Sequence, residues 1–271
     1  MTASLLILTD FFQAANQALD YATNLARPLH ARLVLLHVRR DSALDPEALT
    51  GNFSNLSKEA VALALSSVAR GLPVPVVAEV GYGRVEVAVA DAVARHHPAL
   101  IVLGRPDHSD LPDELVQTTS LELLRHSPYP MLVVPHLMMT SSAPPRRVLM
   151  AVDGEPFSLG AHAGTMQEIF TKLKAEVTVL NVSAGRHELD PAALESVRQT
   201  GLLLDLAPAH ARTVTNANPV RGILQVAQPH DFDLLVVVAR ERSFLGKLFH
   251  RSVTAQLLLD SALPVLVLPA Q

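Results

Sequence analysis

The chain has 271 residues, of which 49% are hydrophobic and 18% are charged, and its formal charge is −4. This apolar content excludes a disordered chain, and the length suggests about two domains. The absence of Cys excludes disulfides, thiolate metal sites and cysteine nucleophiles and fits a cytoplasmic protein. The weak negative charge gives no general attraction to nucleic acid or anionic membranes, so neither is expected as a partner.

Short apolar runs alternate with longer stretches of helical spacing in the first half of the chain. The runs predict strands at Leu5–Leu8, Leu33–Val38, Val74–Val77, Leu100–Leu103 and Met131–Val134. The stretches between them predict helices at Ala14–Leu29, Ala60–Ala69, Val85–Ala94 and Glu114–Leu124. Continuous rather than alternating apolar runs indicate strands buried on both faces. Strands that alternate with helices indicate a parallel sheet with right-handed crossovers.

The same series of elements recurs in the second half. Its apolar runs are Val148–Val152, Val177–Val182, Thr213–Val214, Leu234–Val238 and Val265–Leu268. The ends of the halves match at an offset of 134 residues (Ser127–Pro135 and Ser261–Pro269), and the beginnings match at 143 (Leu8–Asp10 and Ala151–Asp153). The second copy is therefore shorter by about nine residues, and the stretch after the second strand is where we expect the difference. A repeat of this length indicates duplicated domains, at 1–136 and 146–271, joined by a Ser- and Pro-containing linker at 137–145.

An aspartate follows the first predicted strand of each half, at Asp10 and Asp153. Ligands of open parallel sheets bind beyond the carboxyl ends of the strands, where these carboxylates could accept hydrogen bonds from a base or a hydroxyl. An N-cap of the following helix is the competing interpretation. The sequence leaves both open.

The loops after the fourth strands, Gly104–Thr119 and Val238–Val253, complete a pattern that covers nearly the whole chain. With the two aspartates and the last strands, each of which ends at a Pro that would stop the pairing, it resembles the tandem form of the universal stress protein family. The resemblance implies two Rossmann-like α/β domains of the adenine-nucleotide-alpha-hydrolase type. Each would have a five-stranded parallel sheet of order 3-2-1-4-5 with helices on both faces. It also implies that the last strands pair within the chain as a pseudo-twofold dimer, and that two chains form a homodimer.

Nucleotide-binding members of that family carry Gly-x2-Gly-x9-Gly-Ser/Thr after the fourth strand. In the first half Gly104 and the hydroxyl of Thr118 are kept, whereas Asp107 and Gln117 replace the other glycines. Glycines let backbone amides close around phosphate oxygens, so side chains at these positions obstruct the approach. The carboxylate of Asp107 would in addition repel a triphosphate.

In the second half Val238, Glu241 and Arg251 occupy the three glycine positions, and only Ser252 matches the motif. We therefore expect no cofactor, and ATP is disfavoured in both halves. Basic residues nevertheless crowd this loop, at Arg240, Arg242, Lys247, His250 and Arg251. They could hold a phosphate through side chains, form a solvated basic helix start, or dock an acidic partner.

The candidate ligand-binding residues also include Val38 and Val182, where the second apolar run of each half ends. The full set is Asp10, Val38, Gly104, Thr118, Asp153, Val182, Arg240, Arg242, Lys247, Arg251 and Ser252.

Other motifs are weaker indications of chemistry. His96 and His97 lie at a predicted helix C-terminus, where imidazolium complements the helix dipole. Turns are predicted at Gly81–Arg84 and Asn216–Pro219. The sequence has no HExxH or GxSxG motif, and no metal site is expected. The resemblance, together with the altered glycine motifs, implies a non-catalytic cytoplasmic stress-response protein that binds a protein or a small ligand. The alternative is nucleotide or phosphorylated-ligand binding by the basic loop of the second half.

Overall fold

The computed structural model describes residues 3–9, 13–39, 58–105, 122–124, 129–136, 143–185, 191–240 and 252–271. Several candidates from the sequence lie outside these ranges, namely Asp10, Thr118, Arg242, Lys247 and Arg251. Most of the predicted helix Glu114–Leu124 and of the linker also lies outside them. No helix within the described ranges is long and apolar enough to cross a membrane.

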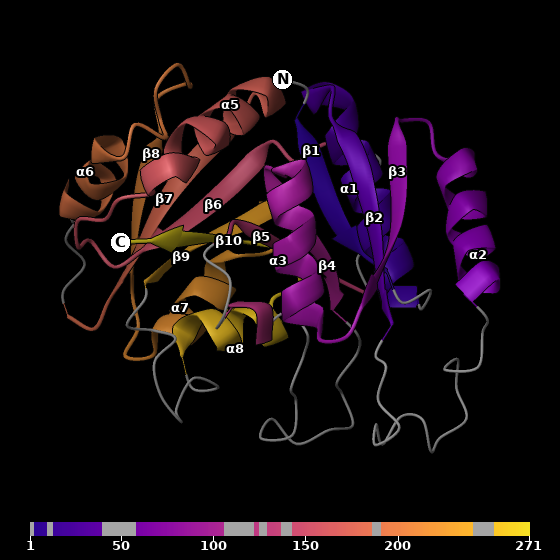
Figure 1. Cartoon of the computed structure of the whole chain (residues 1–271). Coiled ribbons are helices and arrows are strands. Elements are labelled where there is room, and N and C mark those ends of the chain that lie inside the picture. Colours follow the sequence, from indigo (N-terminus) through magenta and orange to yellow (C-terminus); the bar gives the residue numbers. More distant parts are fainter. Residues whose placement is uncertain are drawn as a thin grey trace.

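Ten strands in the described part of the chain form one sheet, of order β3-β2-β1-β4-β5-β10-β9-β6-β7-β8 (Figure 1). The strands are β1 (Ser4–Leu8), β2 (Arg32–Arg39), β3 (Val76–Tyr82), β4 (Leu100–Arg105), β5 (Met131–Pro135), β6 (Arg147–Val152), β7 (Glu176–Ser183), β8 (His210–Thr215), β9 (Leu234–Arg240) and β10 (Val265–Ala270). Within each half the order is 3-2-1-4-5, the order that the resemblance implied, and every pair within a half is parallel.

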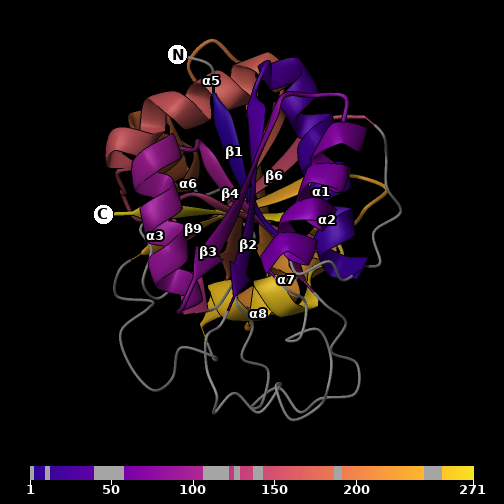
Figure 2. The same ribbon diagram turned by 45° about the vertical axis from the view of Figure 1, so that its right-hand side comes forward.

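Helices cover both faces of this sheet (Figures 1 and 2). One face packs against α1 (Gln13–Leu29), α2 (Lys58–Gly71), α5 (Ala163–Leu173) and α6 (Pro191–Gln199). The other packs against α3 (Val85–His96), α7 (Pro219–Val226) and α8 (Val253–Asp260). The central strands are buried on both sides, which explains why their sequences are continuous apolar runs.

The two halves join through their last strands. β5 and β10 pair antiparallel, with Leu132 opposite Leu266, which confirms the intrachain pairing expected from the resemblance. The helices contribute as well, because Lys172 Nζ on α5 lies 3.5 Å from the carbonyl oxygen of Leu29 at the end of α1. Buried residues of α1 and α5 belong to one continuous core. The halves therefore form a single packed unit.

The largest errors of the sequence-based prediction concern the two edge strands. β3 begins at Val76 and continues through Tyr82, beyond the predicted Val74–Val77, and β8 spans His210–Thr215 rather than two residues. Edge strands are only partly buried, and every residue of β3 and β8 is half-buried or exposed. Their polar residues therefore hide the strands from a search for apolar runs.

The prediction that a proline ends each last strand is confirmed for β5, whose last residue is Pro135, and is wrong for β10. β10 continues through Pro269 to Ala270, which pairs with Arg240, and β5 includes Pro135. β5 pairs with β10 only over Val265–Val267. The later residues of β10 are therefore paired with β9 on one side and have no strand pairing on the side of β5. A proline is tolerated there, because its missing N–H removes no hydrogen bond.

The length difference between the halves lies where it was predicted. Residues 40–75 separate β2 from β3, whereas residues 184–209 separate β7 from β8. In the described part of these segments, α2 has 14 residues and α6 has 9.

Candidate functional site

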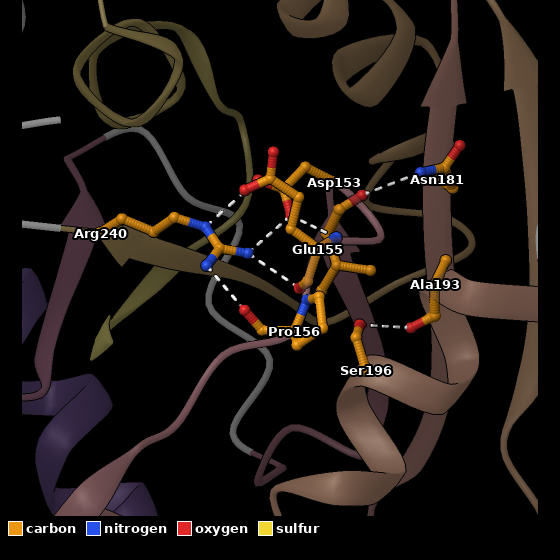
Figure 3. Close-up of polar contacts among 8 residues, drawn as sticks. Asp153, Glu155, Pro156, Asn181, Ala193, Ser196 and Arg240 are labelled. Atoms are coloured by element: carbon orange, nitrogen blue, oxygen red, sulfur yellow. Dashed lines mark hydrogen bonds and ion pairs between the residues drawn. The ribbon is translucent and has the colours of Figure 1, made fainter. Parts of the chain in front are cut away.

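Two of the candidate residues meet at the carboxyl edge of the second half. β6 and β9 are adjacent parallel strands, so Asp153, which follows β6, lies beside Arg240, the last residue of β9. The guanidinium of Arg240 donates to both carboxylate oxygens, from Nη2 to Oδ1 at 2.9 Å and from Nε to Oδ2 at 3.3 Å (Figure 3). This two-pronged geometry is the strong form of an arginine–carboxylate pair.

The remaining contacts of Arg240 are with the loop that follows Asp153. Nη1 donates to the carbonyl oxygen of Pro156 at 2.9 Å, and Nη2 donates to that of Glu155 at 2.8 Å (Figure 3). The guanidinium carbon lies 5.9 Å from the centroid of the Phe157 ring, within cation–π range. Arginine has five N–H donors, and four of them are used by these contacts. Arg240 therefore engages both oxygens of Asp153, the carboxylate that the sequence analysis selected as a ligand acceptor.

Local backbone bonds fix the loop that receives Arg240. Gly154 has a φ of 82°, and Asp153 Oδ1 accepts from the backbone N–H of Glu155, which makes a tight Asx turn. Farther on, Ser158 and Gln271 exchange two backbone hydrogen bonds of 3.1 and 3.0 Å. Asp153 does not cap the next helix, because α5 begins ten residues later at Ala163. For this residue the N-cap interpretation is wrong; Asp10 lies outside the described residues.

The other described candidates of the second half have packing and capping roles. Val182, near the end of β7, packs against Gly222 of α7 so closely that a Cβ on Gly222 would lie 2.5 Å from Val182 Cγ1. Val238 is half-buried in β9 and packs against the core. Ser252 caps α8, since its Oγ accepts from the N–H of Ala255 at 3.1 Å.

The sequence-based reasoning missed a pair of equivalent donors beside the first strands. Asn181 on β7 donates from Nδ2 to the carbonyl oxygen of Val152 at 3.3 Å (Figure 3). In the first half His37 on β2 has its Nδ1 2.9 Å from the carbonyl oxygen of Thr9, so Nδ1 carries the proton. Both bonds hold the residue that precedes the aspartate. The strand registers place His37 and Asn181 at equivalent positions, which is the signal that could have found them.

The described candidates of the first half lie near the ends of their strands. Val38 lies near the end of β2, where its Cγ2 is 3.6 Å from the position of a Cβ on Gly81 of β3, and Gly104 is half-buried near the end of β4. Arg105, the last residue of β4, donates from Nη1 to the carbonyl oxygen of Leu258 at 2.7 Å. It thereby reaches the last turn of α8 in the other half.

The predicted turns and the histidine pair lie at helix ends. Gly83, with a φ of 85°, precedes α3, and Asn218 caps α7 by accepting from the N–H of Arg221. His96 ends α3, and its Nε2 lies 2.6 Å from Glu79 Oε1 on β3. Among the described residues, no group of three or more His, Asp or Glu side chains could hold a metal ion.

A second Arg–Asp pair connects β6 and β9 at the amino ends of these strands, opposite the ends where Asp153 and Arg240 lie. Asp233 accepts from Arg147 Nη2 at 2.6 Å and from Nε at 3.1 Å. It also accepts from the backbone N–H groups of Arg146 and Arg147. Burial opposes ionisation of Asp233, but the Arg147 side chain and the two backbone donors outweigh it and lower the pKa of this carboxyl. The pair is remote from the carboxyl ends of the strands and has a structural role.

Comparison with known proteins places the chain in a family. A model described as "Universal stress protein family" matches residues 1–135 and 145–269. Two solved structures are similar over nearly the whole chain. A universal stress protein from Archaeoglobus fulgidus DSM 4304 has a TM-score of 0.73 and 18% identity, with 98% of each chain covered. A functionally unknown protein from Pseudomonas aeruginosa PAO1 has a TM-score of 0.58 and 20% identity, with 99% of this chain and 92% of that chain covered.

The fold also occurs as a module of a larger protein. The cytoplasmic domain of a prokaryotic cation chloride cotransporter has a TM-score of 0.57 and 11% identity, with 100% of this chain and 95% of that chain covered. At such identities the structures show a common fold alone. No curated protein matches the chain. The two family matches together span most of the sequence, and the chain belongs to the universal stress protein family, in its tandem two-domain form.

Proposed function

We propose that the chain is a non-catalytic cytoplasmic stress-response protein that acts by binding a protein or a small ligand and does not use ATP. The observation that carries this proposal is the place of Arg240. A carboxylate that could accept from a base or a hydroxyl instead accepts from an arginine of the same chain.

Three features of the second half support the proposal against ATP. Arg240 donates to both carboxylate oxygens of Asp153, Val238 puts a side chain at a glycine position of the motif, and Ser252 uses its oxygen to cap α8. A triphosphate needs backbone amides that can approach its oxygens closely, and side chains at glycine positions prevent this.

The alternative function, a phosphorylated ligand held by the basic loop, depended on Arg240 as its first cation. Four of the five N–H donors of Arg240 are already used by Asp153 and two carbonyl oxygens. An arginine in this state has one N–H left for a phosphate, so the alternative would rest on Arg242, Lys247 and Arg251, outside the described residues.

Titration of the purified chain with Mg-ATP tests the proposal by calorimetry, alongside a phosphate-release assay. We expect no saturable heat and no turnover in the wild type. Submicromolar binding would contradict the proposal. Arg240→Ala separates the two functions: if the wild type is stabilised by a phosphorylated ligand and the variant is not, Arg240 binds that ligand and the alternative holds.

A further inference from the structure

We propose that the loop from Asp153 to Phe157 is a receptor for a guanidinium group. In the structure Arg240 fills it, and when Arg240 leaves, the loop accepts a guanidinium from another molecule. This inference rests on the proposed function in one respect, because it assumes that the cleft above Asp153 does not hold ATP.

The hydrogen-bonding groups of the loop match a guanidinium and no anion. All four contacts with Arg240 end on acceptors, namely the two oxygens of Asp153 and the carbonyl oxygens of Glu155 and Pro156. The planar fork of a guanidinium presents its donors in one plane, which suits a carboxylate and flanking carbonyls. The ring of Phe157 adds an aromatic neighbour. An ammonium is a compact point charge and would use this set less completely.

The acceptors keep their positions by bonds that do not involve Arg240. The Asx turn at Asp153, the positive φ of Gly154 and the paired backbone of Ser158 and Gln271 all lie within the loop and its partner segment. Removal of the Arg240 side chain therefore leaves a carboxylate and two carbonyl oxygens directed at one place. The free-energy cost of ordering the loop when a guanidinium binds there is therefore small.

The loop is also open to solvent. The side chain of Asp153 is 55% exposed and that of Arg240 is 15% exposed, and Glu155 and Pro156 are exposed. The acceptors can therefore be reached from outside as soon as Arg240 moves.

The Arg147–Asp233 pair is a related contact that differs in two respects. Arg147 also donates from Nη1 to a backbone carbonyl oxygen, but to one only, that of His230. Asp233 accepts from two backbone N–H groups in addition to Arg147, so it stays satisfied when the arginine is removed. Asp153 accepts from one, that of Glu155, and two carbonyls flank it. The two pairs join the same strands, but only the loop after β6 combines a carboxylate with two converging carbonyl oxygens.

Chemical rescue of Arg240→Ala tests the proposal. We expect guanidinium chloride at low millimolar concentration, well below denaturing concentrations, to raise the melting temperature of this variant in a saturable manner relative to equal NaCl. In the wild type the tethered Arg240 competes as an intramolecular ligand at an effective concentration of the order of millimolar or above. The apparent affinity for guanidinium should therefore be at least about twofold weaker in the wild type, because this competitor is present at a concentration comparable with the dissociation constant or above it.

Two controls make the result decisive. The double variant Asp153→Asn with Arg240→Ala should lose the rescue, and methylammonium should not replace guanidinium in the single variant. If Arg240→Ala does not fold, Arg240→Gln, which keeps part of the stem, is tested in the same way. Absence of saturable stabilisation in the folded variant, or rescue that survives the loss of the Asp153 charge, would overturn the proposal.

The source of the guanidinium is distinguished by two further probes. Agmatine represents a free guanidino compound, and a capped arginine peptide compared with its lysine counterpart represents the side chain of a protein. If Arg240→Ala binds either probe, and Asp153→Asn weakens that binding, the proposal is supported and the probe that binds identifies the source. If neither probe binds, the proposal is contradicted. Titration of the wild type with Mg-ATP remains a separate test, because ATP binding would contradict the proposed function whatever guanidinium does.

Discussion

The contact between β7 and α7 gives a sharp prediction about stability. Gly222 lies in the interior of α7, where alanine would ordinarily be favoured by about 1 kcal/mol because of its helix propensity. A Cβ at this position would lie 2.5 Å from Val182 Cγ1 and 3.1 Å from Asn216 Cβ. Both are stiff neighbours, since a valine in a strand has few rotamers. Forcing a methyl group into such a contact costs about 1–3 kcal/mol. We therefore expect Gly222→Ala to lower the free energy of unfolding by up to about 2 kcal/mol in net terms.

Gly164→Ala is the matched control, because α5 is also a helix and a Cβ on Gly164 would meet nothing within 4 Å. This variant should gain about 0.5–1 kcal/mol. Urea midpoints and melting temperatures of both variants measure the contrast. The double variant Gly222→Ala with Val182→Ala should lose less stability than the sum of the single variants, because the shortened side chain at 182 makes room for the methyl. If Gly222→Ala is as stabilising as Gly164→Ala, the close contact between β7 and α7 does not exist.

Two further predictions concern pH and assembly. Because the pKa of Asp233 is lower in the folded chain than its ordinary value, its contribution is present above the unfolded pKa of about 4 and is lost as the pH falls through the folded value. Asp233→Asn should thus destabilise the chain at neutral pH, and its urea midpoint should converge on that of the wild type in strong acid; an equal gap at both pH values would contradict this. We also propose a homodimer. Light scattering should give twice the chain mass of 29.2 kDa, and substitutions on the buried β5–β10 seam should unfold the chain rather than separate two subunits. A mass of one chain at every concentration would contradict the dimer.

The accuracy of the sequence-based prediction follows the burial of each strand. β1, β4 and β9 lie inside the sheet, and their apolar runs predicted them to within two residues. β3 and β8 lie at the edges, where half of the environment is solvent, and periodicity alone does not find their ends. The end of β10 was predicted too early at Pro269 for a related reason. A proline ends a strand only where its missing N–H would be needed for pairing, and at Pro269 the pairing of β10 with β5 has already ended.

The candidate site was predicted as separate residues and not as an arrangement. Asp153 and Arg240 were both selected, but as ligands of something else. Their contact follows from the strand order, because first and fourth strands are neighbours and their ends share one edge. His37 and Asn181 escaped notice because they are chemically unlike residues at equivalent positions. Only the strand register reveals that both hold the backbone before the aspartate.

The register also shows which residues differ between the two halves at the ends of their fourth strands. β4 and β9 correspond at an offset of 134 residues, because Leu100 and Leu234 pair with the equivalent positions of β1 and β6. The position of Arg240 thus falls on Pro106 in the first half, and proline has no side-chain donor. The preceding positions are Arg105 and the buried Ala239. Arg105 reaches across the seam to the end of α8, whereas Arg240 stays within its own half and bonds to Asp153. A ligand that took the place of Arg240 at Asp153 would have to displace an arginine, whereas the sequence of the first half has a proline at the equivalent position. Equal folds thus give unequal sites, and the functions of the two halves should be measured separately.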